Sequence, residues 1–264
     1  MDFSLAFILA LVLPALALVF ISWTIEFKYH PVSRLQKSKV QSSGTGNISP
    51  NFTYYEKRMN SMVIHPISMS AGFFVLHAYS VVLYRVCCCC SRRAICYFHS
   101  VLSLVSLACG VLGYVSVRPF YSKEYLTEVK PLQTFHSVMG IVVIATTFIQ
   151  SFAGLVVFEC VKKAALLPTA MFRFEFAAYH FHIGFSIFLG GVVAVISGLS
   201  QLPLFAYPPV AKELMHEPGL TKYREAVDGL VICHLAVALS TACVYYVMTR
   251  GDFRLRGRIM MARD

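Results

Sequence analysis

Histidine is the residue type whose placement in this chain points most directly to chemistry. Seven of the nine histidines lie inside long apolar runs, where an ionisable side chain is costly and usually serves a function. Four consecutive apolar runs carry one such residue each near an end: His65, His99, His136 and His180. A neutral imidazole is a common ligand of transition metals and can also relay protons. The chemistry therefore depends on how the surrounding runs place these four side chains.

The composition is that of a protein whose solvent is mostly lipid. Of the 264 residues, 57% are hydrophobic and only 14% are charged, and the mean hydropathy is +0.66. Uninterrupted apolar runs of about 20 residues, without period-two alternation, cross a bilayer as helices. We therefore predict an all-α membrane protein with six transmembrane helices. The six windows are residues 3–25, 61–84, 95–117, 134–158, 176–200 and 229–249.

The first window has a second interpretation as a secretory signal peptide. It lacks a basic start (MDFS) and runs to about 23 apolar residues, which favours a retained helix. The largest loop, residues 26–60, contains the Ser/Gly-rich tract QSSGTGNIS and is predicted to be flexible.

Loop features suggest the orientation of the helices. Lys and Arg are nearly balanced, with 11 on the side that holds the C-terminus and 12 on the other, so the positive-inside rule does not decide. Two N-glycosylation sequons, at Asn47 and Asn51, lie in the 26–60 loop, and sequons are used only in lumenal or extracellular segments. The lumenal loops contain no cysteine, as expected opposite a reducing cytosol. We predict that both termini are cytosolic.

Four consecutive cysteines, Cys87 to Cys90, follow the second window. Thiols beside a membrane helix are typical S-palmitoylation sites. A shared metal ion fits poorly, because adjacent cysteines cannot all point at one ion. The remaining alternative is a thiol run without a function at the lipid boundary, and the sequence leaves acylation and this alternative open.

Because consecutive helices alternate in direction, the four histidines fall into two layers. His65 and His136 lie about one turn inside the lumenal end, and His99 and His180 about one turn inside the cytosolic end. Two imidazoles that face each other across a helical bundle can be the axial ligands of a haem iron. Layers about 13 residues apart stand roughly 20 Å apart, which suits an electron relay across a bilayer of about 30 Å.

Other interpretations of the histidines remain open. Membrane histidines also form interhelical hydrogen bonds, and His77, His182 and His234 show that the chain uses this residue freely. A haem-free transporter could use them as a proton relay, and a structural protein could bind anionic lipid through its basic face. The alternation of one histidine per helix argues against both of these classes.

Three of the apolar runs carry motifs beyond hydrophobicity. The second run, HPISMSAGFFVLHAYSVVLYR, opens on His-Pro and ends on Tyr-Arg, with Arg85 twenty residues after His65. The fourth contains HSVMG and the fifth HFHIGFSIFLGGVVAVISGLS. Together they resemble the cytochrome b561 family of ascorbate-dependent transmembrane electron carriers, which has His-Pro, His-Ser-x-x-Gly and His-x-x-x-Gly…Gly-Leu-Thr motifs. The similarity covers about residues 55–255, and Gly184 selects His180 over His182.

The resemblance implies a central four-helix bundle, formed by spans 2 to 5, that holds two b-type haems. His65 and His136 would be the axial ligands of the non-cytosolic haem iron, and His99 and His180 those of the cytosolic one. The single six-span domain would cover residues 1–264, with its haem-binding core at about 61–200. Reductases that pair histidines within one helix about 13 residues apart fit less well. His65 and His77 are 12 residues apart, about 120° out of register on an α-helix.

Basic residues on the cytosolic face of family members contact haem propionates and bind ascorbate. Arg92 and Arg173 each precede a ligand by seven residues, which is two helical turns or about 10 Å. Guanidinium groups there could pair with carboxylates and attract an anionic reductant. For Arg93 we favour the ordinary role of a basic residue that flanks the cytosolic end of a membrane span. The positions that match the cofactor-binding residues of the family are Arg85, Arg92, Arg173 and Arg254.

The chain also departs from the family pattern. It has KPLQTFHS where the family often has Asn and Tyr before the fourth-span histidine, Cys96 in place of a lysine, and Gln201 where many relatives have Glu. These changes concern the lumenal acceptor site and the detail of ascorbate binding. Arg254 stands where the family usually has a lysine.

The resemblance implies a transmembrane oxidoreductase that carries electrons from cytosolic ascorbate through two haem b groups to a ferric chelate or monodehydroascorbate on the other side. The protein would be a multi-pass membrane protein of the plasma membrane or an endomembrane vesicle, in contact with membrane lipid. Relatives are usually homodimers, and no nucleic-acid partner is expected. The alternative function is the haem-free transporter with a histidine proton relay.

Overall fold

The computed structural model describes residues 3–25, 63–86, 91–118, 132–161, 170–206 and 218–250. All regular secondary structure in these ranges is helical. Residues 63–69 are helical and lead into the first π-helix. The named elements are α1 (Phe3–Thr24), η2 (Ser70–Leu76), α4 (His77–Val86), α5 (Arg92–Val117), α6 (Phe135–Leu155), η4 (Val156–Val161), α7 (Ala170–Ala206) and α9 (Pro218–Arg250), of which the two η elements are π-helical.

The predicted all-α membrane fold is confirmed. Five helical stretches are long and apolar enough to cross a membrane, and α1 carries a shorter apolar stretch, Ile8–Thr24. The five stretches agree with the predicted windows to within about two residues: Val63–Tyr84, Arg93–Val117, Phe135–Phe158, Glu175–Gln201 and Asp228–Thr249.

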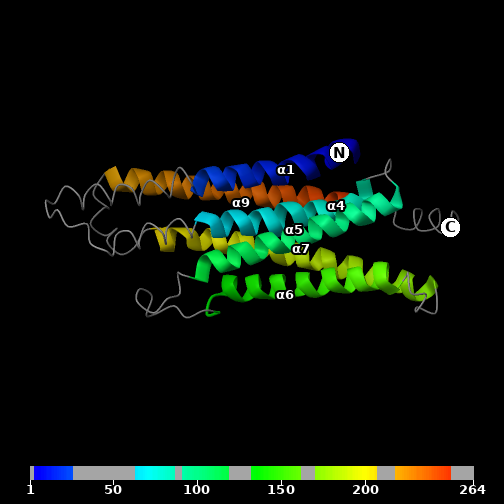
Figure 1. Cartoon of the computed structure of the whole chain (residues 1–264). Helices are drawn as coiled ribbons and strands as arrows, with labels where there is room; N and C mark the ends of the chain where they lie inside the picture. The colour runs from blue at the N-terminus through cyan, green and yellow to red at the C-terminus, as the bar shows by residue number, and fades with distance from the viewer. Residues whose placement is uncertain are drawn as a thin grey trace.

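Consecutive spans run in opposite directions, so the start of α1 and the end of α9 lie at the same end of the bundle (Figure 1). α1 packs along α9, and α9 also contacts α4 and α7. The four histidine-bearing spans are joined by contacts of α5 with η2, α4 and α6, and of α7 with α6 and η2. α1 and α9 therefore lie outside the four-helix unit and cover it along α4 and α7.

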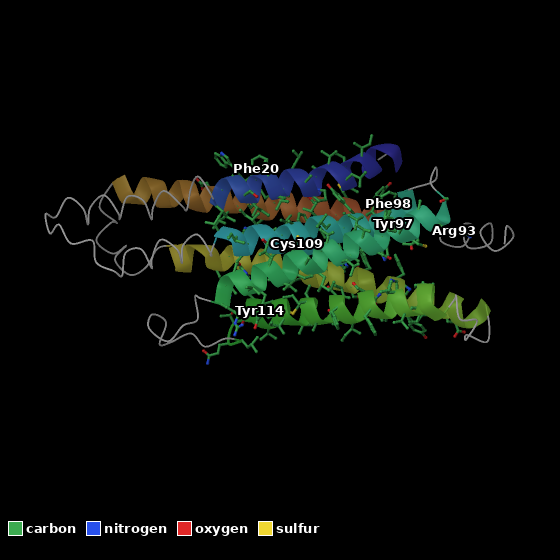
Figure 2. The ribbon with its side chains drawn as sticks, in the orientation of Figure 1. Phe20, Arg93, Tyr97, Phe98, Cys109 and Tyr114 are labelled. Atoms are coloured by element: carbon green, nitrogen blue, oxygen red, sulfur yellow. The ribbon has the colours of Figure 1, made fainter. Side chains whose placement is uncertain are left out.

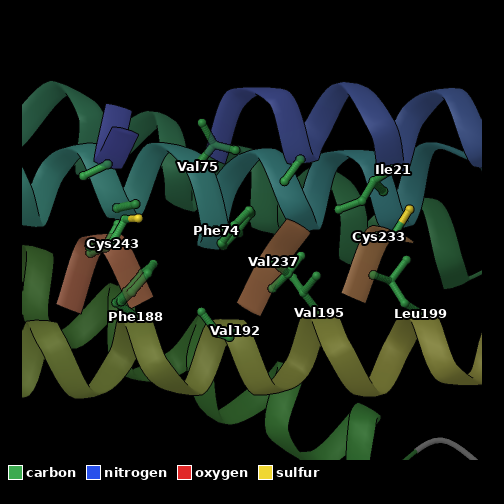
Figure 3. Close-up of a cluster of buried hydrophobic side chains, with 14 of the residues drawn as sticks. Ile21, Phe74, Val75, Phe188, Val192, Val195, Leu199, Cys233, Val237 and Cys243 are labelled. Atoms are coloured by element: carbon green, nitrogen blue, oxygen red, sulfur yellow. The ribbon is translucent and has the colours of Figure 1, made fainter. Parts of the chain in front are cut away.

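The main hydrophobic core lies between these covering helices and the bundle. Figure 3 shows Phe74 of η2, Phe188 of α7 and Val237 of α9 within this core, and all three side chains are fully buried. A smaller cluster of Phe73, Val143 and Ile187 lies among the histidine-bearing helices themselves. Both clusters fix the helices by dense packing, which is the main source of helix association in lipid.

The outer faces of α5 and α6 are apolar and exposed. On α6 the side chains of Phe148, Ile149 and Phe152 are each more than half exposed, as suits a lipid-facing surface. Figure 2 shows Arg93, Tyr97 and Phe98 grouped near one end of α5. Aromatic and basic side chains at a helix end are typical of the membrane–water interface.

One feature of the second span differs from a continuous α-helix, because Ser70–Leu76 is π-helical. The backbone N–H of His77 donates to the carbonyls of Gly72 and Phe74, and the Ser106 hydroxyl of α5 donates to the Gly72 carbonyl at 2.8 Å. A Cβ atom on Gly72 would lie 2.8 Å from the Ser106 carbonyl oxygen, so the close approach of α5 needs glycine. Since a π turn rotates the chain less per residue than an α turn, the 120° offset expected between His65 and His77 does not apply.

Polar caps fix where two of the histidine-bearing helices begin. The Ser91 side chain accepts from the Ala94 N–H at the start of α5. Thr134 and Ser137 form a capping box at the start of α6, directly around His136. The KPLQTFHS departure therefore has a structural role, since its threonine starts the helix that carries this histidine.

Replacing Thr134 with Ala is expected to destabilise the protein by about 1 kcal/mol, because the N–H of Ser137 loses its acceptor. The detergent-solubilised variant should melt at a lower temperature than the wild type. Thr249→Ala is a suitable control, because its hydroxyl donates to the carbonyls of Tyr245 and Tyr246 within its own helix. Equal melting temperatures for Thr134→Ala and the wild type would show that the cap does not stabilise the fold.

Candidate functional site

The structure brings His65 and His136 together near one end of the bundle. Their ring centroids lie 5.9 Å apart and their planes are at 87°. Nδ1 of His65 lies 2.9 Å from the Gly113 carbonyl of α5, and Nδ1 of His136 lies 2.9 Å from the Ala194 carbonyl of α7. Each imidazole is thus held by a helix other than its own.

His99 and His180 form an equivalent pair toward the other end. Their ring centroids lie 6.0 Å apart and their planes are at 66°. Nδ1 of His99 lies 3.0 Å from the Ser80 carbonyl and 2.9 Å from the Ser80 hydroxyl. His180 packs against the rings of Phe158 and Phe176, with centroids 5.6 and 6.0 Å from its own.

The two pairs are built by the same four helices. α5 supplies His99 to one pair and, fourteen residues later, the Gly113 carbonyl to the other. α7 likewise supplies His180 and, fourteen residues later, the Ala194 carbonyl. At 1.5 Å per residue this spacing is about 21 Å along the helix. The layers expected from the sequence are therefore present in the fold at the expected separation.

The hydrogen bonds of three histidines fix the tautomer of each ring. A backbone carbonyl can only accept, so Nδ1 of His65, His99 and His136 must carry the proton and donate. Nε2 then keeps its lone pair, the state that a metal ligand needs. Such a second contact also fixes the ring orientation and raises the basicity of the ligating nitrogen.

Glycines leave room beside the paired rings. A Cβ on Gly198 would lie 2.6 Å from Cε1 of His136, and a Cβ on Gly154 would lie 2.8 Å from Cε1 of His180. A Cβ on Gly140, one turn after His136, would meet no atom of the described residues within 4 Å. The glycine of the ISGLS motif is thereby explained, since any larger residue at Gly198 would displace the ring of His136.

The geometry of the pairs fits a haem iron better than a free metal ion. In the described part of the chain, no group of three or more His, Cys, Asp or Glu side chains could hold an ion, whereas a haem iron needs only two axial ligands from the protein. With ring centroids 5.9 and 6.0 Å apart, the two imidazoles of each pair are close enough that both would be able to hold one haem iron between them.

The predicted basic residues are located here by their backbone positions along the helices. Arg85 lies on α4, Arg92 is the first residue of α5, and Arg173 lies in the first turn of α7. The helices of Arg92 and Arg173 run unbroken to His99 and His180, so the spacing of two turns applies. Arg254, Cys87 to Cys90 and the sequons lie outside the described residues.

Several residues of the site carry no recognisable sequence signal. The structure places Ser80 on His99, and Gln150 of α6 donates to the backbone carbonyl of His180. His182 is exposed, whereas His180 faces His99. His77 was expected only as one of the histidines open to interhelical hydrogen bonding; its side chain is 4% exposed and lies 3.2 Å from the Gly184 carbonyl.

An all-helical membrane bundle with imidazoles paired across its helices is typical of polytopic b-type cytochromes, a class of membrane oxidoreductases. Comparison with known families agrees, because residues 64–206 match the eukaryotic cytochrome b561 family. The match covers more than half of the chain, and the protein belongs to this family. Members of the family bind b-type haem.

Two curated relatives carry the same name. The lysosomal membrane ascorbate-dependent ferrireductase of Mus musculus is 26% identical over 172 residues, which are 64% of this chain and 67% of the mouse protein. The protein of the same name from Rattus norvegicus is also 26% identical over 172 residues, 64% of this chain and 63% of the rat protein. The chain thus spans about two thirds of the mouse relative and somewhat less than two thirds of the rat relative.

Proposed function

We propose that this protein is an ascorbate-dependent transmembrane reductase that carries electrons from cytosolic ascorbate through two haem b groups to a non-cytosolic ferric chelate or monodehydroascorbate. One haem would be held by His99 and His180, and the other by His65 and His136. The names of the two relatives favour a ferric acceptor. Both termini would lie in the cytosol.

The observation that carries this proposal is the pair of facing imidazoles in each of two layers about 21 Å apart along the helices. The two imidazoles of each pair would be close enough to hold one haem iron, and in the neutral ring three of the four keep a lone pair on Nε2. A proton relay would instead need imidazoles that pass protons from one to the next, but the two pairs lie far apart and are separated by the apolar cluster of Phe73, Val143 and Ile187.

Each part of the chain would contribute a specific function. Haem would supply reversible one-electron chemistry at each histidine pair. The carbonyls of Ser80, Gly113 and Ala194 orient the imidazoles before the cofactor binds, and the packed apolar helices exclude water. Arg85, Arg92 and Arg173 would attract the ascorbate anion and pair with propionates. The single six-span domain, its lipid contacts and a homodimer are extensions of the same proposal.

The proposal can be tested in sealed vesicles that contain the purified protein. With ascorbate trapped inside and a ferric chelate outside, ferrous iron should form outside at a rate at least tenfold above that of protein-free vesicles. External ascorbate oxidase removes leaked ascorbate and leaves only transmembrane transfer. A haem-loaded protein that gives no more ferrous iron than empty vesicles would contradict transmembrane reduction of iron, and monodehydroascorbate is then tested as the external acceptor by the same design.

A further inference from the structure

His77 is a buried histidine that belongs to neither pair. Its side chain is 4% exposed, at the junction where the π-helix η2 passes into α4. Because a carbonyl only accepts, Nε2–H of His77 donates to the Gly184 carbonyl of α7 at 3.2 Å. Nδ1 of His77 is buried and has no partner among the described residues. Its Nε2 is thus already engaged with the backbone of another helix.

The acceptor of this bond lies one helical turn after His180. In the same turn, the side-chain amide of Gln150 donates to the carbonyl of His180 itself. Two polar side chains, one from α4 and one from α6, therefore hold the backbone of α7 between residues 180 and 184. Polar side chains buried in a membrane bundle commonly tie helices together in this way.

His180 differs from the other three paired histidines in how its ring is held. Nδ1 of His65, His99 and His136 donates to a carbonyl of another helix, whereas Nδ1 of His180 is buried and has no partner among the described residues. The orientation of this ring is therefore set by its aromatic neighbours and by the backbone to which it is attached. A small rotation or shift of the 180–184 turn would move the ring directly.

We propose that His77 is a positioning residue for His180, and that it acts by clamping the 180–184 turn of α7 through the Gly184 carbonyl. This inference rests on the proposed function, because it treats His180 as an axial ligand. The π-helix is part of the device, since it rotates His77 less than an α-helix would and brings its side chain against α7. Loss of the clamp changes the angle between the imidazoles of His180 and His99 without removing either ligand.

The test compares His77→Leu, which removes the donor, with His77→Gln, which keeps an N–H that can reach a carbonyl. Low-spin ferric haem gives an electron paramagnetic resonance signal whose position depends on the angle between its two axial imidazole planes. The signal of the His99–His180 haem is identified by its loss in His99→Ala. In His77→Leu this signal should shift, and the midpoint potential of the His99–His180 haem should change. The signal of the other haem should stay in place. His77→Gln should restore both values toward the wild type.

A matched control uses another interhelical histidine. His234 of α9 lies 3.2 Å from the Ile196 carbonyl and 3.1 Å from the Ser200 hydroxyl of α7, beyond the Ala194 carbonyl. His234→Leu should leave the His99–His180 signal unchanged, which separates the clamp from general loosening of the helices. If His77→Leu does not assemble, His77→Met also removes the donor to the Gly184 carbonyl and should shift the same signal.

The outcomes separate this inference from the function on which it rests. A wild-type protein that binds no haem would contradict the proposed function itself. If the wild type holds two haems and both signals are unchanged in His77→Leu, the function stands and His77 has no positioning role. Equal shifts in His77→Leu and His77→Gln would also overturn the proposal, because the hydrogen bond would then not be the cause. If His77→Met is the variant used, an unchanged signal contradicts the positioning role of His77.

Discussion

Replacing His180 with Ala is expected to remove one of two haems and to lower the rate of reduction by ascorbate about a hundredfold or more. Losing a group that hydrogen-bonds to a metal ligand typically lowers metal affinity or activity 10- to 100-fold, and this change removes the proposed ligand itself. The haem content should fall to half, with the remaining haem held by His65 and His136. Stopped-flow mixing with ascorbate, with haem quantified per chain, measures both effects.

The control for this change lies on the same helix. His182 is only two residues away, but its side chain is exposed, whereas His180 packs against His99. His182→Ala should therefore keep both haems and the wild-type rate. A His180→Ala protein with two haems and unchanged kinetics, or a His182→Ala protein with the defect instead, would show that the ligand has been wrongly assigned.

Gly198→Ala is expected to weaken retention of the haem at the His65–His136 pair. The new Cβ would lie 2.6 Å from Cε1 of His136, so the ring must leave the position in which its Nδ1 bonds the Ala194 carbonyl. Losing this outer contact and the ring orientation should weaken retention of that haem about 10-fold or more. The measurement is the haem content after extensive dilution in detergent, compared with the wild type.

A second glycine provides the control for Gly198→Ala. Gly229 of α9 also packs closely on a neighbour, since its Cβ would lie 3.1 Å from a methyl group of Thr24 in α1, but it faces no histidine. Gly229→Ala should retain both haems. If the two variants lose haem equally, tight helix packing rather than access to His136 would explain the effect.

Much of the fold could be predicted because lipid imposes simple rules. A spanning segment must be about 20 apolar residues long and must satisfy its own backbone, so hydropathy alone located the spans closely. The pairing of the four histidines also followed, because alternating helices return every second histidine to the same end. His65 faces His136, and His99 faces His180, as these rules require.

The outer contacts of the site could not be predicted, because they depend on tertiary structure. Three of the paired imidazoles donate to the backbone carbonyls of Ser80, Gly113 and Ala194. Every residue has such a carbonyl, so no residue type marks these positions in the sequence. The π-helix of the second span was missed for a related reason. The Gly72 carbonyl inside it accepts from Ser106, and a contact between residues 34 positions apart leaves no local signal in the sequence.

The most direct test of the central claim is an absorption spectrum of the purified, detergent-solubilised protein before and after addition of ascorbate, with haem quantified per chain. We predict two haems per chain and sharp α-bands that appear when ascorbate is added. A colourless protein that takes up no added haem would contradict the account, and the paired histidines would then serve helix packing or proton transfer.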